Sequence, residues 1–310
     1  MHFSLLVALS FLAFSHAGTY KNIDDLWSFD LNAEQNADWM GTITDNTLLS
    51  SLSIPGTHNS MTDKLENILM KTQNVPLAQQ LTGGIRYIDI TCRYRNYIIE
   101  VYHGLTDTGY SLGNVIDTLI DFLDQHPRET IILRIQRGGI FDSPETFLKT
   151  IKTYFISGPI VDDRIIQHIY WGGPGDVTAP TLREARGKIV ILFAPGTFFL
   201  PSKWAGVKSI INQSPPKDSH KLRITHTTAS FGAGPINIAA RPSPSSGMNK
   251  FLGEYLMNDE GNCFGIVVMD FPGNLLVQQI LKLNDKHRVP NLPESIDTDT
   301  VSVDDPVHGA

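Results

Sequence analysis

Two histidines in this chain follow short apolar runs and stand next to or near glycine, a placement that suits acid–base chemistry. His58 lies in residues 53–60 and follows Pro55-Gly56, and His103 follows the apolar run 98–102. One imidazole can accept a proton while a second donates one, so the pair suits a reaction that needs both transfers. Barrel enzymes keep their catalytic groups at the carboxyl ends of strands, and we therefore expect both rings at one rim.

Two aspartates follow the same logic. Asp270 closes a late apolar run, and in a closed barrel the last strand lies beside the first, so Asp270 can accept a hydrogen bond from His58 and raise its basicity. Asp89 lies within another apolar run, where strand alternation places Asp89, Thr91 and Arg93 on one face.

Each of these residues also has a purely structural interpretation. A histidine is more often structural or at the surface than catalytic. Asp270 could cap the turn before Pro272, and Asp89 could pair with Arg93 as a satisfied interior ion pair. The placement of all of them at strand ends favours the catalytic interpretation.

The rest of the chain alternates apolar runs with amphipathic stretches, which predicts an α/β fold. The predicted strands are 52–54, 87–92, 98–102, 130–136, 188–193, 222–227 and 264–270. The predicted helices are 75–81, 112–125, 144–155, 181–185, 248–257 and 275–284. Strands that are apolar on both faces suit a parallel sheet covered by helices. We predict a distorted (β/α)8 TIM barrel, irregular because a turn rather than a helix follows the strand of Asp89.

Composition limits the function classes. The chain has 310 residues, a net charge of -7 and a pI of about 5.8, which exclude nucleic acid as a partner and disfavour adsorption to anionic membranes. Brief contact of apolar loops with a lipid surface stays open. We find no internal repeat and expect a monomer.

The chain divides into four expected parts. Residues 1–17 form a short apolar run ending in Ser-His-Ala, typical of a secretory signal peptide cleaved after Ala17 and too short to span a bilayer; a buried N-terminal helix is the alternative. Residues 18–47 are a lead-in packed on the barrel, with Trp27 and Trp39 as anchors. Residues 48–290 are the catalytic barrel and 291–310 an acidic disordered tail.

Two further expectations concern loops and cysteines. Residues 202–219 and 229–246 are rich in Gly, Pro and Ser and are expected to be long connections that shape the substrate mouth. Cys92 ends one predicted strand and Cys263 starts another, at opposite ends of a parallel barrel, so we expect them to be unpaired.

A series of motifs along residues 38–284 resembles a known family. In order, the motifs are Ser53-Ile-Pro-Gly-Thr-His58-Asn-Ser, Gly84-Ile-Arg-Tyr-Ile-Asp89-Ile, Tyr102-His103-Gly104, Glu129-Thr-Ile-Ile-Leu and Gly265-Ile-Val-Val-Met-Asp270-Phe-Pro. This series resembles the X domain of phosphatidylinositol-specific phospholipase C, and is most similar to its secreted single-domain bacterial and fungal forms.

The resemblance implies a distorted TIM barrel that cleaves the glycerol–phosphate bond of an inositol phospholipid at a membrane surface. The inositol 2-hydroxyl attacks phosphorus, which releases diacylglycerol and a cyclic inositol phosphate. On this mapping His58 is the general base, oriented by Asp270, and His103 is the general acid toward the diacylglycerol leaving group.

The chain departs from the family pattern around the phosphate. Thr91 stands where metal-independent bacterial members have an arginine and calcium-dependent animal members an aspartate, and Gln136 stands where those members carry a lysine or a glutamate. Only Asn59 and Asp89 remain as candidate calcium ligands, too few for an ion that takes six to eight oxygens, so we expect no cofactor, with weak Ca2+ binding left open.

The chain's own cations are the expected substitutes at the phosphate. We expect Arg93, two residues beyond Thr91 on the same strand face, to neutralise the phosphate, with Arg134 as the second candidate. A structural role for both arginines is the alternative.

Two alternative functions remain at this point. One is a sphingomyelinase D-like or glycerophosphodiesterase-like activity. This alternative fits the chain less well, because those enzymes hold a metal with several carboxylates and Thr91 removes one of them. The other is a secreted barrel that binds a ligand without turnover.

Overall fold

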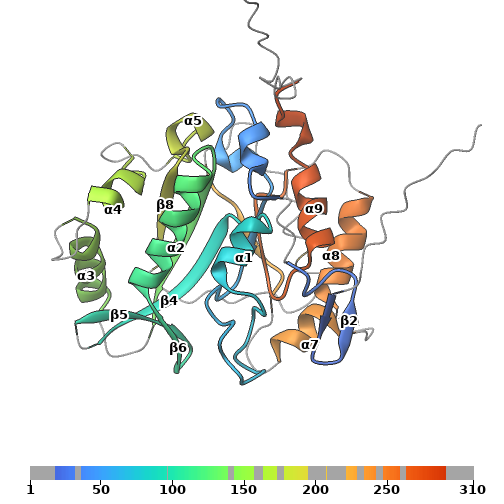
Figure 1. Ribbon diagram of the computed structural model, residues 1–310, viewed down its shortest axis with the longest axis horizontal. Coiled ribbons are helices and arrows are strands. Elements are labelled where there is room, and N and C mark those ends of the chain that lie inside the picture. Colours follow the sequence, from blue (N-terminus) through green and yellow to red (C-terminus); the bar gives the residue numbers. More distant parts are fainter. Residues whose placement is uncertain are drawn as a thin grey trace, which may run out of the picture.

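A curled parallel sheet surrounded by helices forms the centre of the molecule (Figure 1). The computed structural model describes residues 18–31, 36–95, 97–138, 143–156, 163–172, 178–194, 207, 221–228, 234–241, 247–258 and 263–290. The predicted signal peptide, the predicted acidic tail, loop 202–219 apart from one residue, and much of 229–246 lie outside these ranges.

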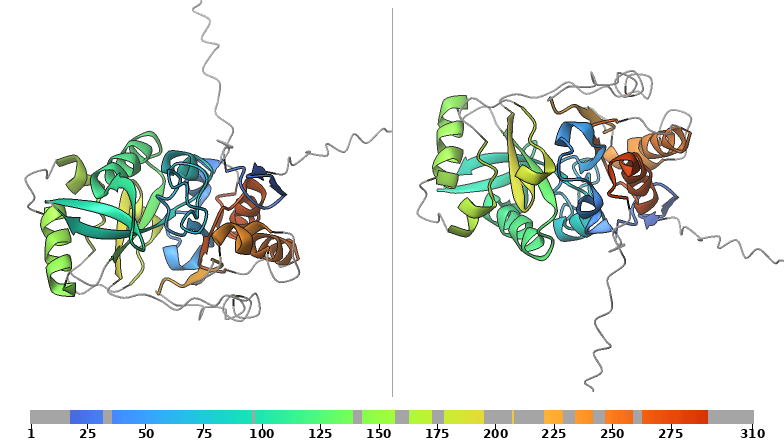
Figure 2. Two further views of the ribbon diagram at one scale, coloured as in Figure 1. Left: turned by 90° about the horizontal axis from the view of Figure 1, so that it is seen from below. Right: turned by 90° about the horizontal axis from the view of Figure 1, so that it is seen from above.

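The parallel strands lie side by side in the order β9, β10, β3, β4, β7 and β8. Their bounds are Ile54–Thr57 (β3), Tyr87–Arg95 (β4), Thr130–Arg137 (β7), Lys188–Ala194 (β8), Ile224–His226 (β9) and Ile266–Met269 (β10). The late strand β10 pairs with β3, so the predicted meeting of the last and first strands is confirmed. From below and above, the helices lie around the outside of the curled sheet (Figure 2).

The predicted strand 98–102 does not belong to this parallel wall. It forms β5 (Ile98–His103), which runs antiparallel to the second half of β4, and β6 (Thr106–Ser111) runs antiparallel to β5. A parallel return needs a crossover of a dozen or more residues, whereas only residues 96–97 separate β4 from β5. The expectation of another parallel barrel strand here was therefore wrong. The chain passes from β4 to β5 without an intervening helix, as predicted, but Tyr94 and Arg95 of the predicted turn belong to β4.

The predicted helices are present, with ends shifted by a few residues. Their bounds are Leu77–Thr82 (α1), Leu112–Gln125 (α2), Pro144–Ile156 (α3), Leu182–Ala185 (α5), Met248–Met257 (α8) and Asn274–Lys282 (α9). Two further helices, Asp163–His168 (α4) and Pro235–Ala240 (α7), were not predicted. The second begins with a proline at its first position, inside a stretch expected to be a loop.

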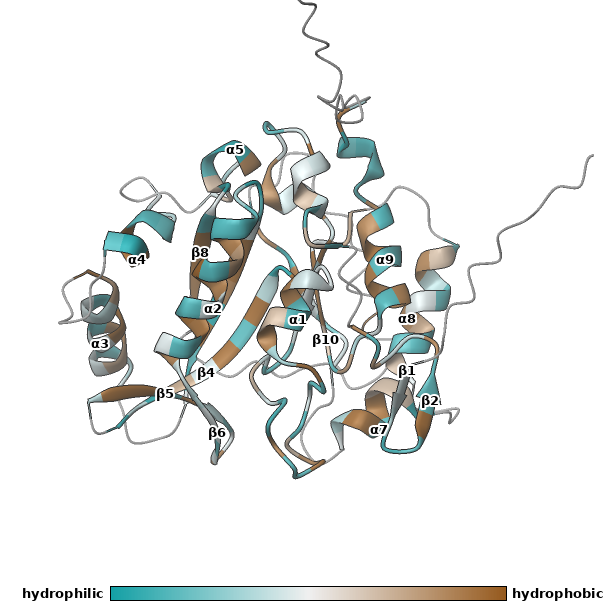
Figure 3. Cartoon of the chain, in the orientation of Figure 1, coloured by the Kyte–Doolittle hydropathy of each residue, from teal (hydrophilic) through white to brown (hydrophobic). Residues whose placement is uncertain are grey.

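Helix α2 shows why the pattern predicts these elements well. The Ser111 hydroxyl accepts a hydrogen bond from the backbone N–H of Asn114, and the Asn114 side-chain oxygen accepts one from the backbone N–H of Ser111. The apolar positions at helical spacing are all buried, and the solvent-facing positions are hydrophilic (Figure 3).

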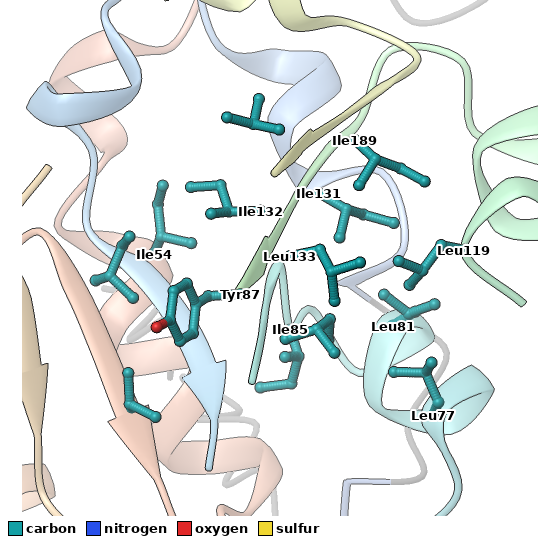
Figure 4. Close-up of a cluster of buried hydrophobic side chains, with 14 of the residues drawn as sticks. Ile54, Leu77, Leu81, Ile85, Tyr87, Leu119, Ile131, Ile132, Leu133 and Ile189 are labelled. Atoms are coloured by element: carbon teal, nitrogen blue, oxygen red, sulfur yellow. The ribbon is translucent and has the colours of Figure 1, made fainter. Parts of the chain in front are cut away.

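The apolar core lies on both sides of the sheet. Tyr87 and Ile132 are paired in register and face the inside of the curl, whereas Ile131 and Leu133 face the other way, toward Leu119 of α2 (Figure 4). These layers are apolar, so the polar groups of the site lie beyond them, toward the carboxyl ends of β3 and β10.

The lead-in packs against both ends of the sheet. The buried Trp27 lies at the carboxyl end, where its carbonyl accepts the Gly273 N–H at 2.8 Å. At the amino end, the buried Trp39 donates its indole N–H to the Gly84 carbonyl at 3.0 Å. Nearby, Arg86 and Glu129 form a fully buried ion pair, and Glu129 also accepts the Gly41 backbone N–H at 2.8 Å. Because the Glu129 carboxylate accepts hydrogen bonds from both Arg86 and Gly41, the pair is a satisfied structural anchor.

The remaining elements are short. The lead-in also contains a hairpin of β1 (Gly18–Tyr20) and β2 (Ile23–Asp25). Short 3-10 turns occupy Trp39–Thr42, Leu49–Ser51 and Asp285–His287. Cys92 and Cys263 are unpaired, as expected. Within the described residues, none of the helices has the length and apolar character needed to span a membrane.

Candidate active site

The site begins where β3 and β10 end side by side. Thr57 and Met269 are in register, so the next residue of each strand, His58 and Asp270, meet just beyond the sheet. The His58 Nδ1 donates to Asp270 Oδ1 at 2.9 Å, and Asp270 is almost fully buried. This is the contact expected from the sequence, and it leaves Nε2 as the basic nitrogen of the ring.

Asp270 has a direct electrostatic effect on His58. Burial by itself lowers the pKa of the His58 imidazole, but the Asp270 charge and its hydrogen bond raise it, as does the more distant Asp89, so the pKa lies above its ordinary value. The Asn59 amide nitrogen lies 2.8 Å from Nε2 and donates to it. The ring is therefore held in one tautomer by partners at both nitrogens.

The backbone of His58 is fixed by a loop that follows it in the chain. The Gln73 amide donates to the carbonyls of both His58 and Met269, each at 3.0 Å, and so bridges the two strand ends. The Thr72 hydroxyl donates to the His58 carbonyl at 2.9 Å. These polar side chains satisfy carbonyl groups beyond the sheet and make the imidazole's position rigid.

Asp89 and Arg134 form a second buried pair at the same end of the sheet. They are in register on β4 and β7, and Arg134 Nη1 donates to Asp89 Oδ1 at 2.6 Å. Both side chains are at least 94% buried, since only 6% and 2% of their surfaces are exposed. The guanidinium and the carboxylate both influence the pKa of His58, so this pair lies within electrostatic reach of the ring.

His103 reaches the site from the antiparallel arm, which consists of the second half of β4 together with β5 and β6. Its Nδ1 donates to the Met70 carbonyl at 2.6 Å, and its ring centroid lies 6.0 Å from that of His58 at an interplanar angle of 74°. Burial lowers the pKa of His103, and the neighbouring His58 lowers it further. The two histidines are thus brought together as the sequence predicts, although by an unexpected route.

Arg93 lies farther out on the arm. Its guanidinium stacks 4.4 Å from the Tyr102 ring centroid and donates to the Gly104 carbonyl at 2.6 Å. A side chain added at Gly138 would meet both Thr91 and Arg93, so these two residues share a face as predicted. Arg93 thus borders His103, whereas Arg134 lies beside the centre formed by His58 and Asp270.

His226 also reaches the site, and the sequence analysis did not single it out. It ends β9, and its ring centroid lies 6.0 Å from that of His58 at 84°. Burial lowers the pKa of His226 to about 4, so the ring is neutral at physiological pH. It stands at a strand end, the same signal that identified His58, but its strand has only three residues.

Several buried polar atoms near this corner have no hydrogen-bond partner within the described structure. They include His226 Nδ1, Thr228 Oγ1 and Tyr87 Oη. By strand register, Tyr87 pairs with Gly56 and His226 pairs with Val268, which are themselves in register two residues before His58 and Asp270. Buried groups of this kind normally have a partner, so their presence together indicates a polar ligand or water.

The residues present do not fit a calcium ion. The Asp89 carboxylate is occupied by the Arg134 guanidinium, and the Asn59 amide is directed at His58. Within the described ranges, His, Cys, Asp and Glu side chains nowhere gather in a group of three or more able to hold a metal. A cation in this place would have to displace a buried arginine, which is itself positively charged.

Comparison with known proteins places this geometry in context. Residues 47–193 match the family model for the phosphatidylinositol-specific phospholipase C X domain. The chain is 28% identical to a 1-phosphatidylinositol phosphodiesterase of Listeria monocytogenes, over 90% of this chain and 95% of that protein. It is 29% identical to a Staphylococcus aureus 1-phosphatidylinositol phosphodiesterase over 53% of each chain.

Solved structures agree. The phosphatidylinositol-specific phospholipase C from Listeria monocytogenes superposes with a TM-score of 0.67 at 26% identity, covering 81% of this chain and 99% of that one. A Staphylococcus aureus structure, at 18% identity and a TM-score of 0.68 over 83% of this chain and 99% of that one, shows the same fold.

The curled parallel barrel with paired histidines at its carboxyl rim defines a phospholipase C-like phosphodiesterase fold, a distorted barrel of the TIM type. Within that class, residues 47–193 belong to the phosphatidylinositol-specific phospholipase C X domain family, and most of the chain is similar to a bacterial 1-phosphatidylinositol phosphodiesterase.

Proposed function

We propose that this protein is a phosphatidylinositol-specific phospholipase C that converts phosphatidylinositol to diacylglycerol and a cyclic inositol phosphate. The observation that carries the proposal is the pairing of His58, bonded through Nδ1 to Asp270, with His103, bonded through Nδ1 to a backbone carbonyl. In both rings Nε2 is the nitrogen left for substrate, one to accept a proton and one to donate it.

The reaction follows from these two nitrogens. His58 Nε2 accepts the proton of the inositol 2-hydroxyl, whose oxygen attacks phosphorus and closes a five-membered cyclic phosphodiester. The bond from phosphorus to the glycerol oxygen breaks, and that oxygen takes the proton from His103 Nε2. Asp270 stabilises the imidazolium that forms on His58. Asn59 must release Nε2 when the hydroxyl binds, since both compete for one lone pair.

The protonation of His103 depends on the charge of the bound substrate. The acid must be protonated before the reaction, yet burial and the neighbouring His58 lower the pKa of His103 in the free protein. A bound phosphodiester brings a negative charge against the ring and favours the protonated form. The site must also provide a positive charge that balances the negative charge of the bound phosphodiester.

Arg134 supplies that charge in this proposal. Its guanidinium is held by Asp89 and lies within electrostatic reach of His58. A guanidinium preorganised in a buried site stabilises developing negative charge on phosphorus oxygens without reorganisation. Arg93, the first candidate from the sequence, becomes the second, because its guanidinium is engaged by the Gly104 carbonyl and the Tyr102 ring.

The headgroup and the lipid surface would meet different edges of the site. The unpartnered polar atoms of His226, Thr228 and Tyr87 suit hydroxyl groups of the inositol ring. On the arm side, Leu69 is 61% exposed, and Leu105 is 85% exposed two residues after the acid. These apolar side chains suit transient contact with a membrane.

The acid itself lies between these apolar segments. Met70 follows Leu69, its carbonyl accepts the hydrogen bond from His103, and its side chain approaches Gly104.

We further propose that the protein is secreted after cleavage behind Ala17, acts as a monomer and needs no metal. N-terminal sequencing of the extracellular protein tests the first statement, and a mature protein that begins at Met1 would contradict it.

The test of the function uses phosphatidylinositol vesicles with the purified mature protein, in calcium and in chelator. We expect cyclic inositol phosphate in both, and none from the His58→Ala variant. Product only with calcium would overturn metal independence, and no product in either condition would overturn the phospholipase assignment in favour of a barrel that binds without turnover.

A further inference from the structure

We propose that Asn249 is a positioning residue for this reaction: it ties the turn that carries Asp270 to the N-terminal lead-in and so holds the carboxylate against His58. The expected effect on catalysis rests on the proposed function, whereas the expected effect on the position of Asp270 does not depend on it. Asn249 lies in the first turn of α8 and is fully buried.

One amide nitrogen serves three acceptors. The two N–H groups of Asn249 Nδ2 are shared among the Asp270 carbonyl at 3.0 Å, the Phe271 carbonyl at 3.2 Å and the Ser28 hydroxyl at 2.9 Å. Two acceptors belong to the turn after β10 and the third belongs to the lead-in. A single buried side chain therefore joins the end of the last strand to a segment more than 200 residues away in sequence.

The turn needs such a tie because its backbone is held in an unfavourable conformation. Phe271 has a φ of 46° and Phe29, which faces it, a φ of 77°, both in the left-handed region that bulky residues avoid. The Phe29 N–H donates to the Phe271 carbonyl at 3.3 Å, and the Phe271 N–H donates to the Thr72 carbonyl at 2.8 Å. Such conformations persist only where the surroundings over-determine them.

The sheet alone does not position Asp270. The register of β10 with β3 ends at Met269 and Thr57, so Asp270 is the first residue beyond the ladder. Its main-chain direction is set by the turn that follows, and the turn is set by Asn249 and the lead-in. Loss of these bonds lets the turn relax and moves the carboxylate away from the His58 Nδ1.

His58 reports that movement. The charged and titratable groups around it are Asp270 on the β10 side, Asp89 and Arg134 on β4 and β7, His103 on β5 and His226 on β9. Replacing Asn249 leaves all five in the chain, so a changed His58 titration reflects the position of Asp270. Among these groups Asp270 raises the pKa of His58 most.

The experiment compares Asn249→Ala with Asn284→Ala. Asn284 is an equally buried amide that bonds the Ser53 backbone through both of its atoms at 2.8 Å, at the opposite end of β3. Its loss destabilises the barrel without touching Asp270. Asn249→Ser, which keeps a shorter hydrogen-bond donor, provides a milder variant if the alanine variant does not fold.

We expect Asn249→Ala to move the His58 imidazole titration, followed by NMR and assigned with His58→Ala, to lower pH. We also expect a 10-fold or larger drop in kcat with an unchanged KM, and Asn249→Ser to shift in the same direction by less. Asn284→Ala should leave the titration where it is in the wild type. An unshifted titration in folded Asn249 variants, or an equal shift in Asn284→Ala, would overturn the proposal. Since the titration needs no substrate, a wild-type protein without phospholipase activity would contradict the proposed function and leave the positioning result standing.

Discussion

Comparing a single with a double variant of the Asp89–Arg134 pair distinguishes a role of Arg134 in stability from a role of Arg134 at the substrate phosphate. The two side chains are almost entirely buried and bonded at 2.6 Å. Arg134→Ala leaves a carboxylate without its partner in the interior, whereas the double variant Asp89→Asn/Arg134→Gln removes both charges and keeps similar volumes. The two variants share the loss of the guanidinium but differ in the charge that remains.

Their expected magnitudes differ accordingly. Breaking a buried ion pair from one side costs about 3–5 kcal/mol in the free energy of unfolding, while replacing both partners by hydrophobic residues of similar volume is often close to neutral. The Asn–Gln pair leaves no unpaired charge, so we expect it to cost less than Arg134→Ala. Removing a preorganised group that stabilises transition-state charge costs about 10²–10³-fold in kcat. We therefore expect Arg134→Ala to lose both stability and turnover, and the double variant to lose turnover while remaining folded.

The assay is turnover of phosphatidylinositol vesicles in chelator, paired with urea unfolding of each variant. Arg93→Ala is the matched control, because its guanidinium lies on Tyr102 and Gly104 at the arm, and we expect near wild-type turnover from it. Wild-type turnover by the double variant would refute the role of Arg134. A loss in Arg93→Ala as large as in the double variant would return the phosphate to Arg93.

Three further predictions concern the base, the lipid surface and the neutral histidine. Asp270→Asn removes the charge that raises the pKa of His58, so the acidic limb of the pH–kcat profile should move to lower pH with a drop in kcat of about 10²-fold or more; an unmoved limb would contradict the assignment. Leu69→Ser should reduce turnover of vesicles several-fold but not of a monomeric short-chain substrate, whereas Met257→Ser, 60% exposed against 61% for Leu69, should change neither; equal losses on both substrates would argue against membrane contact. The pKa of His226 is lowered to about 4, so between pH 6.5 and 4 the unfolded chain binds a proton that the folded protein does not, and stability falls. In urea unfolding measured across this pH range, His226→Asn should remove about 3 kcal/mol of that loss. An unchanged pH dependence of stability in His226→Asn would contradict this prediction.

Much of this site is predictable from the sequence because buried parallel strands leave a distinct pattern. Runs of apolar residues that end in polar ones mark both the strands and their rim, which is how His58 and Asp270 were found. Their contact follows from the parallel pairing of β10 with β3, which brings the two strand ends side by side. The shared face of Thr91 and Arg93 follows from strand alternation alone.

Other features depend on geometry that a single sequence does not carry. The pairing of Asp89 with Arg134 depends on the register between β4 and β7, and so does the choice between the two arginines. The length of the connection did contain the information that β5 is antiparallel, since the two residues between β4 and β5 are too few for a crossover. Asn249 has no motif, because its role comes from a contact with Ser28 far away in the chain.

The division of labour between the two histidines is tested most directly by changing the leaving group. A general acid matters when the departing alkoxide is strongly basic and matters little when the leaving group is a weakly basic nitrophenolate. We therefore expect His103→Ala to lose most of its turnover of phosphatidylinositol but to recover much of it on the nitrophenyl ester of inositol phosphate. His58→Ala should remain inactive on both substrates. Recovery in His58→Ala, or no recovery in His103→Ala, would contradict the assignment of base and acid.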